Sequence, residues 1–326
     1  MPHAVIPSRE QVRAVLKESH ALWGAGLSLA AYVDMWEELA ESSWARSCYA
    51  WRAWVDGDGR VLSSLKLYRP QLRLGESVFR SRAIGAVFTP RLLRGRGYAA
   101  DLIRAVLAEE PGADAEPAFL FTDIGVGYYA GFGFAALPCE DAVGTLAAPP
   151  AQPKHRVRLR TMTQADLDRV GEAHARFCDG RPIAIIRDRA HWEFLLLRAE
   201  AFFRRVDGSG LERRFMIAEE GGAPAGYLVA VLGPGEWNLR EAAAFDGSDA
   251  TLARILAAGA EDAYLTGART VWGWIPRSWW PLVPSWRLRL QPRLRAIPMI
   301  RPPESLTMPD ALDTAEGAFI SYLDQF

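Results

Sequence analysis

The residues from Pro90 to Glu110, PRLLRGRGYAADLIRAVLAEE, contain a pattern that could bind a phosphate group. An apolar run, AIGAVFT at 83–89, comes directly before them, so a strand-like segment leads through a glycine-rich turn into a helix-like segment. The first amides of a helix lack partners within the helix, and the helix dipole favours negative charge there. Small residues at Gly95, Gly97 and Ala99 would let phosphate oxygens approach the backbone. The turn therefore predicts an anion site.

Two other nucleotide-binding motifs could explain this turn. A Walker A loop requires G-x-x-x-x-G-K-[ST], and no lysine follows these glycines, which excludes it. The dinucleotide fingerprint G-x-G-x-x-A fits Gly95-x-Gly97-x-x-Ala100. In that fold the first glycine follows its strand almost directly, whereas here Pro90–Arg94 intervenes and an antiparallel meander precedes the strand. A dinucleotide-dependent oxidoreductase that binds NAD is therefore the second-ranked hypothesis, and a turn that binds nothing is the third.

The hexapeptide RGRGYA at 94–99 fits [R/Q]-x-x-G-x-[G/A] and resembles the pyrophosphate loop of the Gcn5-related N-acetyltransferase (GNAT) superfamily. A second segment, YYAGFGF at 128–134, resembles the [F/Y]-Y-x-x-x-G-F motif that follows the fifth strand in many GNAT domains. One predicted helix and one predicted buried strand separate the two motifs, as in that family. The resemblance covers residues 8–145 and implies that the loop binds the pyrophosphate of acetyl-CoA.

The resemblance also implies a set of cofactor-binding residues. The strand at 86–88 would align its backbone with the pantetheine arm of acetyl-CoA, and the amides of the loop would hold the pyrophosphate. The implied residues are Ala86, Val87, Phe88, Arg94, Gly95, Arg96, Gly97, Tyr98 and Ala99.

The implied reaction is transfer of an acetyl group from acetyl-CoA to a primary amine. The amine must be neutral to attack the thioester, and the departing thiolate benefits from a proton. Tyr129 occupies the position at which family members often carry a general-acid tyrosine, and a phenol with a pKa of about 10 can donate at neutral pH. Tyr128 is the adjacent alternative, and aromatic packing beneath the loop is the structural alternative for Tyr129.

The general base has several candidates. Asp123 ends the buried strand predicted at 117–123, and ligands collect at the carboxyl ends of strands in α/β sheets. It is therefore predicted as a catalytic residue, with an Asx-type turn as its structural alternative. The helix predicted at 29–42 has one acidic face, for which a solvated surface is the structural alternative. Its carboxylates are Asp34, Glu37, Glu38 and Glu41.

The order of the predicted elements is that of an α/β fold with an internal repeat. The first half is predicted to contain helices at 8–20 and 29–42, strands at 48–55, 61–68 and about 78–89, a helix at about 95–109, and a strand at 117–123. A proline- and alanine-rich linker follows at 146–155. The order then repeats with a hairpin at 214–232, a strand at 237–245, a helix at 249–265 and a strand at 270–276.

We therefore expect an α/β (α+β) fold class with two tandem GNAT-like domains, each a mixed, mostly antiparallel sheet flanked by helices. Residues 1–147 would form the catalytic domain and residues 156–326 a degenerate GNAT-like domain. The segment REAAAFDGSDAT at 240–251 stands where the second loop should be, but it lacks the motif, and Asp246 and Asp249 would oppose a pyrophosphate. The second domain is expected to support the first or to shape the acceptor site.

Composition limits the partners that we expect. The chain has 326 residues, 50% of them apolar, and a net charge of −1, which gives no overall attraction to nucleic acid or to an anionic membrane. Three scattered cysteines and five scattered histidines have no metal-ligand spacing, so we expect no metal. The chain opens without a secretory signal, and no apolar stretch is long enough to span a bilayer. A cytoplasmic monomer or homodimer is the resulting expectation.

The nature of the acceptor follows from a narrower resemblance. The segment FTDIGVGYYAGFGF at 121–134 resembles fungal lysine N6-acetyltransferases, which implies a free amino acid or a similar small-molecule amine. Tandem-GNAT aminoglycoside acetyltransferases are a second similar group. Arginines and tryptophans interleave at 263–303, and the alternation that begins at Trp286 favours a strand with a solvated arginine face over a nucleic-acid site. A non-catalytic acyl-CoA sensor, which would tolerate loss of Tyr129, remains the alternative function.

Overall fold

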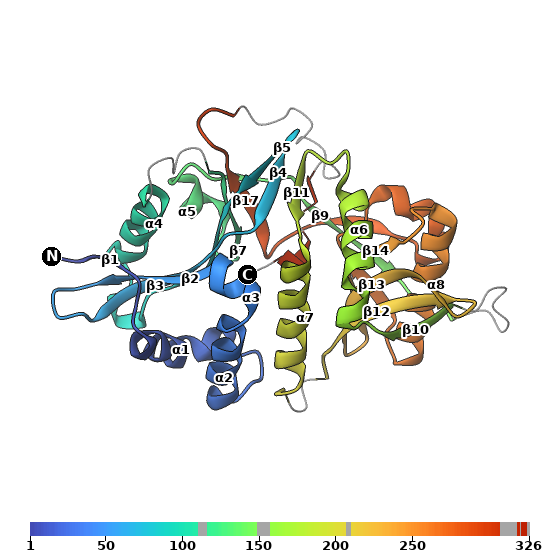
Figure 1. The fold of residues 1–326 in the computed structure, drawn as a ribbon, viewed down its shortest axis with the longest axis horizontal. Helices are drawn as coiled ribbons and strands as arrows, with labels where there is room; N and C mark the ends of the chain where they lie inside the picture. The colour runs from blue at the N-terminus through green and yellow to red at the C-terminus, as the bar shows by residue number, and fades with distance from the viewer. Residues whose placement is uncertain (110–115, 149–156, 207–209, 307–317, 320, 325–326) are drawn as a thin grey trace.

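The structure is a computed structural model and describes residues 1–109, 116–148, 157–206, 210–306, 318–319 and 321–324. Two units of helices and sheet lie side by side along the long axis, and the helix α7 (Arg189–Phe203) lies between them (Figure 1). The expected mixture of helices with mostly antiparallel sheets is confirmed. The division into domains at 1–147 and 156–326 stays a prediction, because strands of each half enter the sheet of the other.

The first half of the chain contains these elements: β1 (His3–Val5), α1 (Arg9–Trp23), α2 (Leu29–Ala40), α3 (Ser43–Cys48), β2 (Tyr49–Val55), β3 (Val61–Tyr68), β4 (Gln71–Leu74), β5 (Ser77–Arg80), β6 (Arg82–Phe88), α4 (Tyr98–Ala108), β7 (Ala118–Thr122), α5 (Val126–Ala130), β8 (Ala135–Ala136) and β9 (Glu140–Thr145). The second half contains β10 (Val157–Thr161), α6 (Leu167–Cys178), β11 (Ile183–Ile186), α7, β12 (Glu212–Glu220), β13 (Ala223–Gly233), β14 (Glu236–Ala244), α8 (Asp249–Leu265), β15 (Thr270–Gly273), β16 (Arg289–Pro292), β17 (Ile297–Arg301) and β18 (Ala318–Phe319).

Three predicted elements differ from the structure. The strand predicted at about 78–89 is two strands, because Ser81 turns the chain between β5 and β6 and its hydroxyl donates to the Pro70 carbonyl at 2.8 Å. The strand predicted at 270–276 ends at Gly273, whose φ is +147°. The alternation that begins at Trp286 becomes a strand only in β16, because Arg287 has a φ of +51°.

Each half is built around a seven-stranded sheet. The first has the order β1-β2-β3-β6-β7-β17-β8, and the second has the order β10-β12-β13-β14-β15-β9-β16. In both sheets an antiparallel meander leads through one helix to a parallel strand: α4 joins β6 to β7, and α8 joins β14 to β15. The third sheet, β18-β11-β4-β5, joins strands of the two halves.

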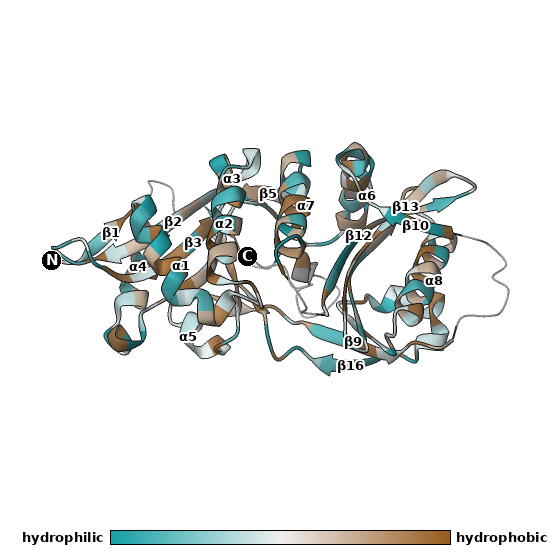
Figure 2. Ribbon diagram, turned by 90° about the horizontal axis from the view of Figure 1, so that it is seen from below, coloured by the Kyte–Doolittle hydropathy of each residue, from teal (hydrophilic) through white to brown (hydrophobic). Residues whose placement is uncertain are grey.

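The two large sheets exchange one strand each. Strand β17 pairs with β7 in the first sheet, and β9 pairs with β15 in the second, so each inserted strand stands beside the parallel strand that follows the helix. Figure 2 shows β9 and β16 beneath the second unit, far from the N-terminus. The exchange binds the halves together through backbone hydrogen bonds, whose separation would expose unpaired strand edges.

The apolar core extends across both halves. Helices α1 and α2 cover one face of the first sheet, and α4 covers the other (Figure 1). The largest cluster joins residues such as Tyr32, Met35 and Tyr68 of the first half to Trp192 and Phe215 of the second. Burial of these large side chains contributes on the order of 2 kcal/mol each.

A buried charged network holds the C-terminal segment in this core. The guanidinium of Arg187 donates to both oxygens of Asp324 and to the carboxylate of Glu241, and each of these side chains is at most 1% exposed. His174 places its Nδ1 at 3.0 Å from Glu241 and its Nε2 at 3.0 Å from the Ile185 carbonyl oxygen. Because both neighbours accept hydrogen bonds, the geometry favours the imidazolium form of His174.

Stability is expected to fall at alkaline pH through this network. Burial and the Arg187 charge disfavour protonation of His174, but the Glu241 carboxylate and hydrogen bonds outweigh them and raise its pKa to about 10. A group whose pKa is raised by folding contributes its full stabilisation below its unfolded pKa, which is about 6.5 for histidine. This contribution to the free energy of unfolding is lost as pH rises through the folded pKa. Urea titrations should therefore show the free energy of unfolding falling between these limits, by up to about 1.4 kcal/mol per pH unit. His174→Gln should flatten this slope, and an unchanged slope in the variant would contradict the assignment.

Candidate functional site

A cavity of about 950 Å³ opens where the first sheet splits between β6 and β7. The two strands pair in parallel only over Arg82–Ile84 and Ala118–Leu120. Beyond these residues, towards their carboxyl ends, β6 and β7 no longer pair with each other. Residues of α1, α2, β3, β6, the glycine turn, α4 and α5 line the cavity. It lies at the carboxyl ends of parallel strands, where open α/β sheets bind their ligands.

The strand β6 carries a bulge beside this cavity. Ser64 pairs with Phe88 and Lys66 with Gly85, so that Ala86 and Val87 of β6 stand against a single residue of β3. Ala86 has a φ of +47°, which residues with a side chain rarely adopt. Bulges bend a strand and leave a residue outside the ladder. Both bulge residues line the cavity, so this stretch of backbone is available to a ligand.

The glycine turn provides an open cradle at the N-terminus of α4. Gly95 and Gly97 have φ values of +76° and +83°, and Gly97 is the residue that precedes the first turn of the helix. A Cβ atom added at either glycine would meet no atom within 4 Å, so the space above both is empty. The Nε of Arg94 donates to the Thr89 carbonyl at 3.1 Å, which ties the turn to the end of β6. The unpartnered first amides of a helix of this length suit an anion.

All of the predicted cofactor-binding residues line this one cavity. They form two segments, 86–88 on the bulged strand and 94–99 in the turn and the start of α4. Asp123 and Tyr129 line the same cavity. The fold therefore brings the predicted site residues together, and their individual roles stay predictions.

Tyr129 lies in the short helix α5 and is buried, with 7% of its surface exposed. Its ring packs edge-on against Tyr128 and Phe134, at centroid distances of 5.0 and 6.3 Å. Burial, with smaller effects of Tyr128 and Asp123, raises the pKa of the Tyr129 phenol to about 12. The phenol is therefore protonated at neutral pH and can donate. Tyr128 also lines the cavity but is 40% exposed.

Asp123 follows β7 and has a structural partner that its sequence position did not indicate. Its Oδ1 accepts a hydrogen bond from the Ala296 backbone N–H at 2.8 Å, just before the exchanged strand β17. The expected Asx-type turn is absent at Asp123 itself; Thr122 instead accepts from Ile124 N–H and donates to the Gly125 carbonyl. Asp123 thus fastens the inserted strand to the rim of the cavity.

The acidic face of α2 lies outside the cavity. Glu37 is bound by Arg9 and Arg13, whose hydrogen bonds lower its pKa to about 2. Glu38 is bound by Arg204 and Arg205 of the second half. These carboxylates form a surface ion-pair network, which supports the solvated-face interpretation.

Lys66 is a cavity residue that sequence reasoning missed. It lies on β3, lines the cavity and is only 2% exposed. Its Nζ stands over the Trp36 ring at 2.7 Å from the centroid and 5.1 Å from that of Trp51. The available signal was a single lysine within the apolar run VLSSLKLY, at a strand position where burial was expected.

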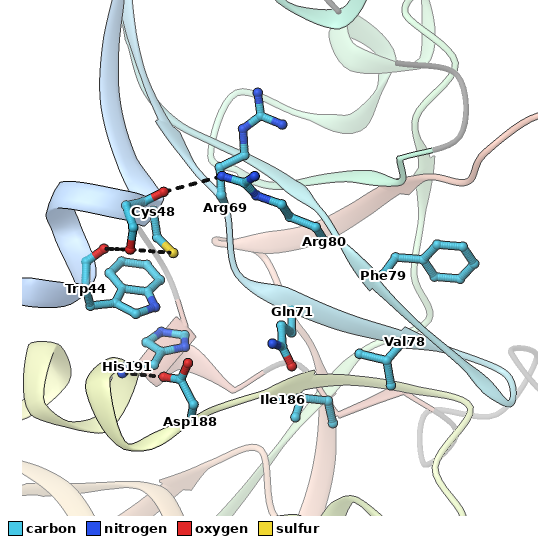
Figure 3. A pocket seen from close by; sticks show the side chains of 11 residues that line it. Trp44, Cys48, Arg69, Gln71, Val78, Phe79, Arg80, Ile186, Asp188 and His191 are labelled. Carbon is cyan, nitrogen blue, oxygen red and sulfur yellow. Dashed lines mark hydrogen bonds between the residues drawn. The ribbon is translucent and has the colours of Figure 1, made fainter. Parts of the chain in front are cut away.

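A second cavity, of about 450 Å³, lies between the halves and shares no lining residue with the first. Figure 3 shows the rings of Trp44 and His191 stacked on one side of the cavity, with Phe79 and Val78 on the other side. Asp188 accepts the His191 backbone N–H at 2.8 Å and caps α7. This cavity contains neither the glycine turn nor Tyr129, so it is not the predicted donor site.

The corresponding helix of the second half has its N-terminus filled by its own side chains. Asp246 accepts hydrogen bonds from the backbone and hydroxyl of Ser248 and from the hydroxyl of Thr251, at the start of α8. Ser248 also caps the helix by accepting from the Thr251 N–H. An anion would meet a carboxylate at this position, as the sequence indicated.

Neither a metal cluster nor a membrane span is found within the described part of the chain. No group of three or more His, Cys, Asp or Glu side chains there could hold a metal ion. No helix there is both long and apolar enough to cross a bilayer.

Residues 12–137 match the family described as an acetyltransferase (GNAT) domain. No curated protein matches the chain. Solved structures with a similar fold include a probable N-acyltransferase from Enterococcus faecalis V583, at 14% identity and a TM-score of 0.69, covering 93% of this chain and 73% of that one. A GCN5-related N-acetyltransferase from Kribbella flavida has 17% identity and a TM-score of 0.62, with 92% and 70% covered.

Saccharomyces cerevisiae N-myristoyltransferase with bound myristoyl-CoA is a further similar structure, at 11% identity and a TM-score of 0.58, covering 98% of this chain and 89% of that one. At these identities the likeness concerns the fold. Together with the matched domain it identifies residues 12–137 as a GNAT acetyltransferase domain and the protein as an acyltransferase. Acyltransferases of this fold use an acyl-CoA donor.

Proposed function

We propose that the protein is an N-acetyltransferase that moves an acetyl group from acetyl-CoA to a primary amine of a small molecule by direct attack. The observation that carries this proposal is the single cavity that joins the empty cradle above Gly95 and Gly97 to the buried phenol of Tyr129. In this proposal the amides of 94–99 hold the pyrophosphate, and the backbone at 86–88 aligns with the pantetheine arm. The buried phenol of Tyr129 favours a transferase over a non-catalytic acyl-CoA sensor.

We further propose that the second half is a degenerate GNAT-like domain. Its meander, helix and parallel strand repeat the order of the first half, and Asp246 occupies the place where a phosphate would bind. Its contribution would be to complete the first sheet with β17 and to support the core of the first half through α7. The segment at 121–134 supports a free amino acid or a similar amine as acceptor.

Gly97→Glu is expected to abolish binding of acetyl-CoA. The new side chain would enter the empty cradle, bring a negative charge to the anion site and strain a backbone with a φ of +83°. Thermal unfolding should be followed with acetyl-CoA, CoA and NAD added separately. A ligand at 100 times its Kd adds about 2.7 kcal/mol to the folded state, which raises the midpoint of the wild type. The variant should show no such rise with acetyl-CoA or CoA.

Gly235→Glu is the matched control for this experiment. Gly235 has a φ of +77°, its Cβ would also meet no atom within 4 Å, and it is not among the residues that line the cavity. This variant should keep the full stabilisation by acetyl-CoA. Stabilisation of the wild type by NAD alone would overturn the transferase proposal in favour of the oxidoreductase. Release of the CoA thiol in the presence of a panel of amines would then identify the acceptor.

A further inference from the structure

The acceptor end of the cavity contains a lysine with unusual surroundings. Lys66 projects from the face of β3 that α2 covers, since its neighbours Leu65 and Leu67 belong to the cluster on the α4 face. It pairs across the sheet with Gly85, which has no side chain to cover it. The bulge at Ala86 and Val87 follows directly. Lys66 therefore stands next to the backbone along which the proposed function places the pantetheine arm.

No carboxylate balances this amine in the described part of the chain. Lys66 takes part in none of the ion pairs there, and the charged group that affects it is Arg198 of α7, which has the same sign. Burial first, and then Arg198, lower the pKa of Lys66 well below its ordinary value. The indole faces of Trp36 and Trp51 attract a cation, but a full charge buried without a counter-ion costs more than such contacts return.

Three phenols lie in the core on the same side of the first sheet and do not change this conclusion. They come from three elements: Tyr32 of α2, Tyr49 of β2 and Tyr68 of β3. Burial raises the pKa of each of them, so all three are neutral at physiological pH. These phenols therefore add no charge near Lys66, and the other charged residues that line the same cavity are Asp123, Arg94 and Arg96.

We propose that Lys66, present as a neutral amine, is the general base that takes a proton from the ammonium group of the acceptor. The inference rests on the proposed function. It assigns the general base, a role for which the sequence had indicated only carboxylates. Of those carboxylates, Asp123 accepts the Ala296 N–H through Oδ1, and the four of the segment 29–42 do not line the cavity. Lysines tuned by burial serve as bases in this way.

The proton transfers balance as follows. The acceptor ammonium gives one proton to Nζ of Lys66, and its freed electron pair forms the C–N bond to the thioester carbonyl carbon. As the C–S bond breaks, Tyr129 donates its proton to the sulfur and regains one from the nitrogen that becomes the amide. Lys66 then releases its proton to water. The sum is one amide, one thiol and one proton from an ammonium ion and a thioester.

The first test measures the charge of Lys66 directly. The chain contains three lysines, Lys17, Lys66 and Lys154, so protein labelled with ¹³C-lysine should give three side-chain signals. The signal lost in Lys66→Met should titrate well below the ordinary range of a lysine side chain. A Lys66 signal that titrates in the ordinary range of a lysine would overturn the proposal. Methionine has a similar length and no charge, so the variant should fold and still be stabilised by acetyl-CoA.

The second test separates a base from a fixed positive charge. With the amine that gives the fastest thiol release, Lys66→Met and Lys66→Arg should each lower kcat by about 10²–10⁴-fold and remove the acidic limb of the kcat–pH profile. Arginine carries a fixed positive charge and stays protonated, so full activity of Lys66→Arg would assign an electrostatic role and overturn the proposal. The same holds if Asp123→Asn alone removes that limb, or if acetyl-CoA acetylates Lys66 itself, as judged by intact mass.

These outcomes are distinct from failure of the proposed function. If acetyl-CoA does not stabilise the wild type, or if no amine releases thiol, the transferase proposal fails whatever the titration of Lys66 shows. If acetyl-CoA stabilises the wild type and an amine releases thiol, but Lys66 is charged at neutral pH, only the assignment of the base fails.

Discussion

Tyr129→Phe is expected to lower kcat by about 10²–10⁴-fold while leaving the stabilisation by acetyl-CoA unchanged. The substitution removes one hydroxyl and keeps the ring that packs against Tyr128 and Phe134. A pKa of about 12 keeps the phenol protonated, so the wild type should also lose no activity through Tyr129 up to about pH 10. Initial rates of thiol release across this pH range, together with thermal unfolding, measure both expectations.

Tyr128→Phe is the matched control, because Tyr128 is adjacent, lines the same cavity and is 40% exposed. It should retain activity within a few-fold of the wild type if Tyr129 is the acid. The reverse pattern, with the large loss in Tyr128→Phe, would transfer the role to Tyr128. Full activity of both variants would mean that the thiolate leaves without help from either phenol.

Arg187→Leu is expected to destabilise the fold by about 3–5 kcal/mol. The substitution leaves the carboxylates of Glu241 and Asp324 buried without the guanidinium that binds both. A buried charge that loses its partner keeps its full desolvation penalty, whereas the pair in the wild type is nearly balanced. Urea denaturation at pH 7 measures the change, and the C-terminal segment should become accessible to protease because Asp324 anchors it.

Arg189→Leu, two residues further on at the start of α7, provides the comparison. Arg189 also binds two carboxylates, Asp168 and Glu193, but its side chain is 45% exposed. Solvent screens such pairs, so the expected loss is small beside that of Arg187→Leu. Equal effects of the two substitutions would show that burial does not decide the strength of the Arg187 network.

Local signals in the sequence were sufficient for most elements of the first half. The strand at 61–68 has the predicted limits, and α2 begins at Leu29 as expected, because Ser28 accepts a hydrogen bond from the Ala31 N–H and caps it. The turn between β12 and β13 lies at Gly221 and Gly222, both with positive φ. These features depend on residues that are close together in the chain, so the sequence alone is sufficient to predict them.

The residues of the candidate site also divide into those that local sequence signals indicate and those that only the fold brings together. The glycine turn and the segment at 128–134 could be recognised because their backbone requirements, positive φ and the start of a helix, are written in consecutive residues. Lys66 could not be recognised, because its surroundings come from α2, β2 and α7, which are distant in the sequence. Its chemistry depends on burial and on Arg198, neither of which the residue type indicates.

The sequence by itself determined the fold class, the glycine turn at the start of α4, the tyrosine that lines the same cavity and the absence of such a turn from the second half. Only the tertiary structure decided that β9 and β17 are exchanged, that Asp123 holds the inserted strand and that Lys66 enters the cavity without a carboxylate partner. The physical reason is that pairing of short strands and burial of charges are set by contacts between distant segments. The gain in hydrogen bonds and apolar burial from such contacts depends on the whole assembled core, whereas turns and caps are satisfied within a few residues.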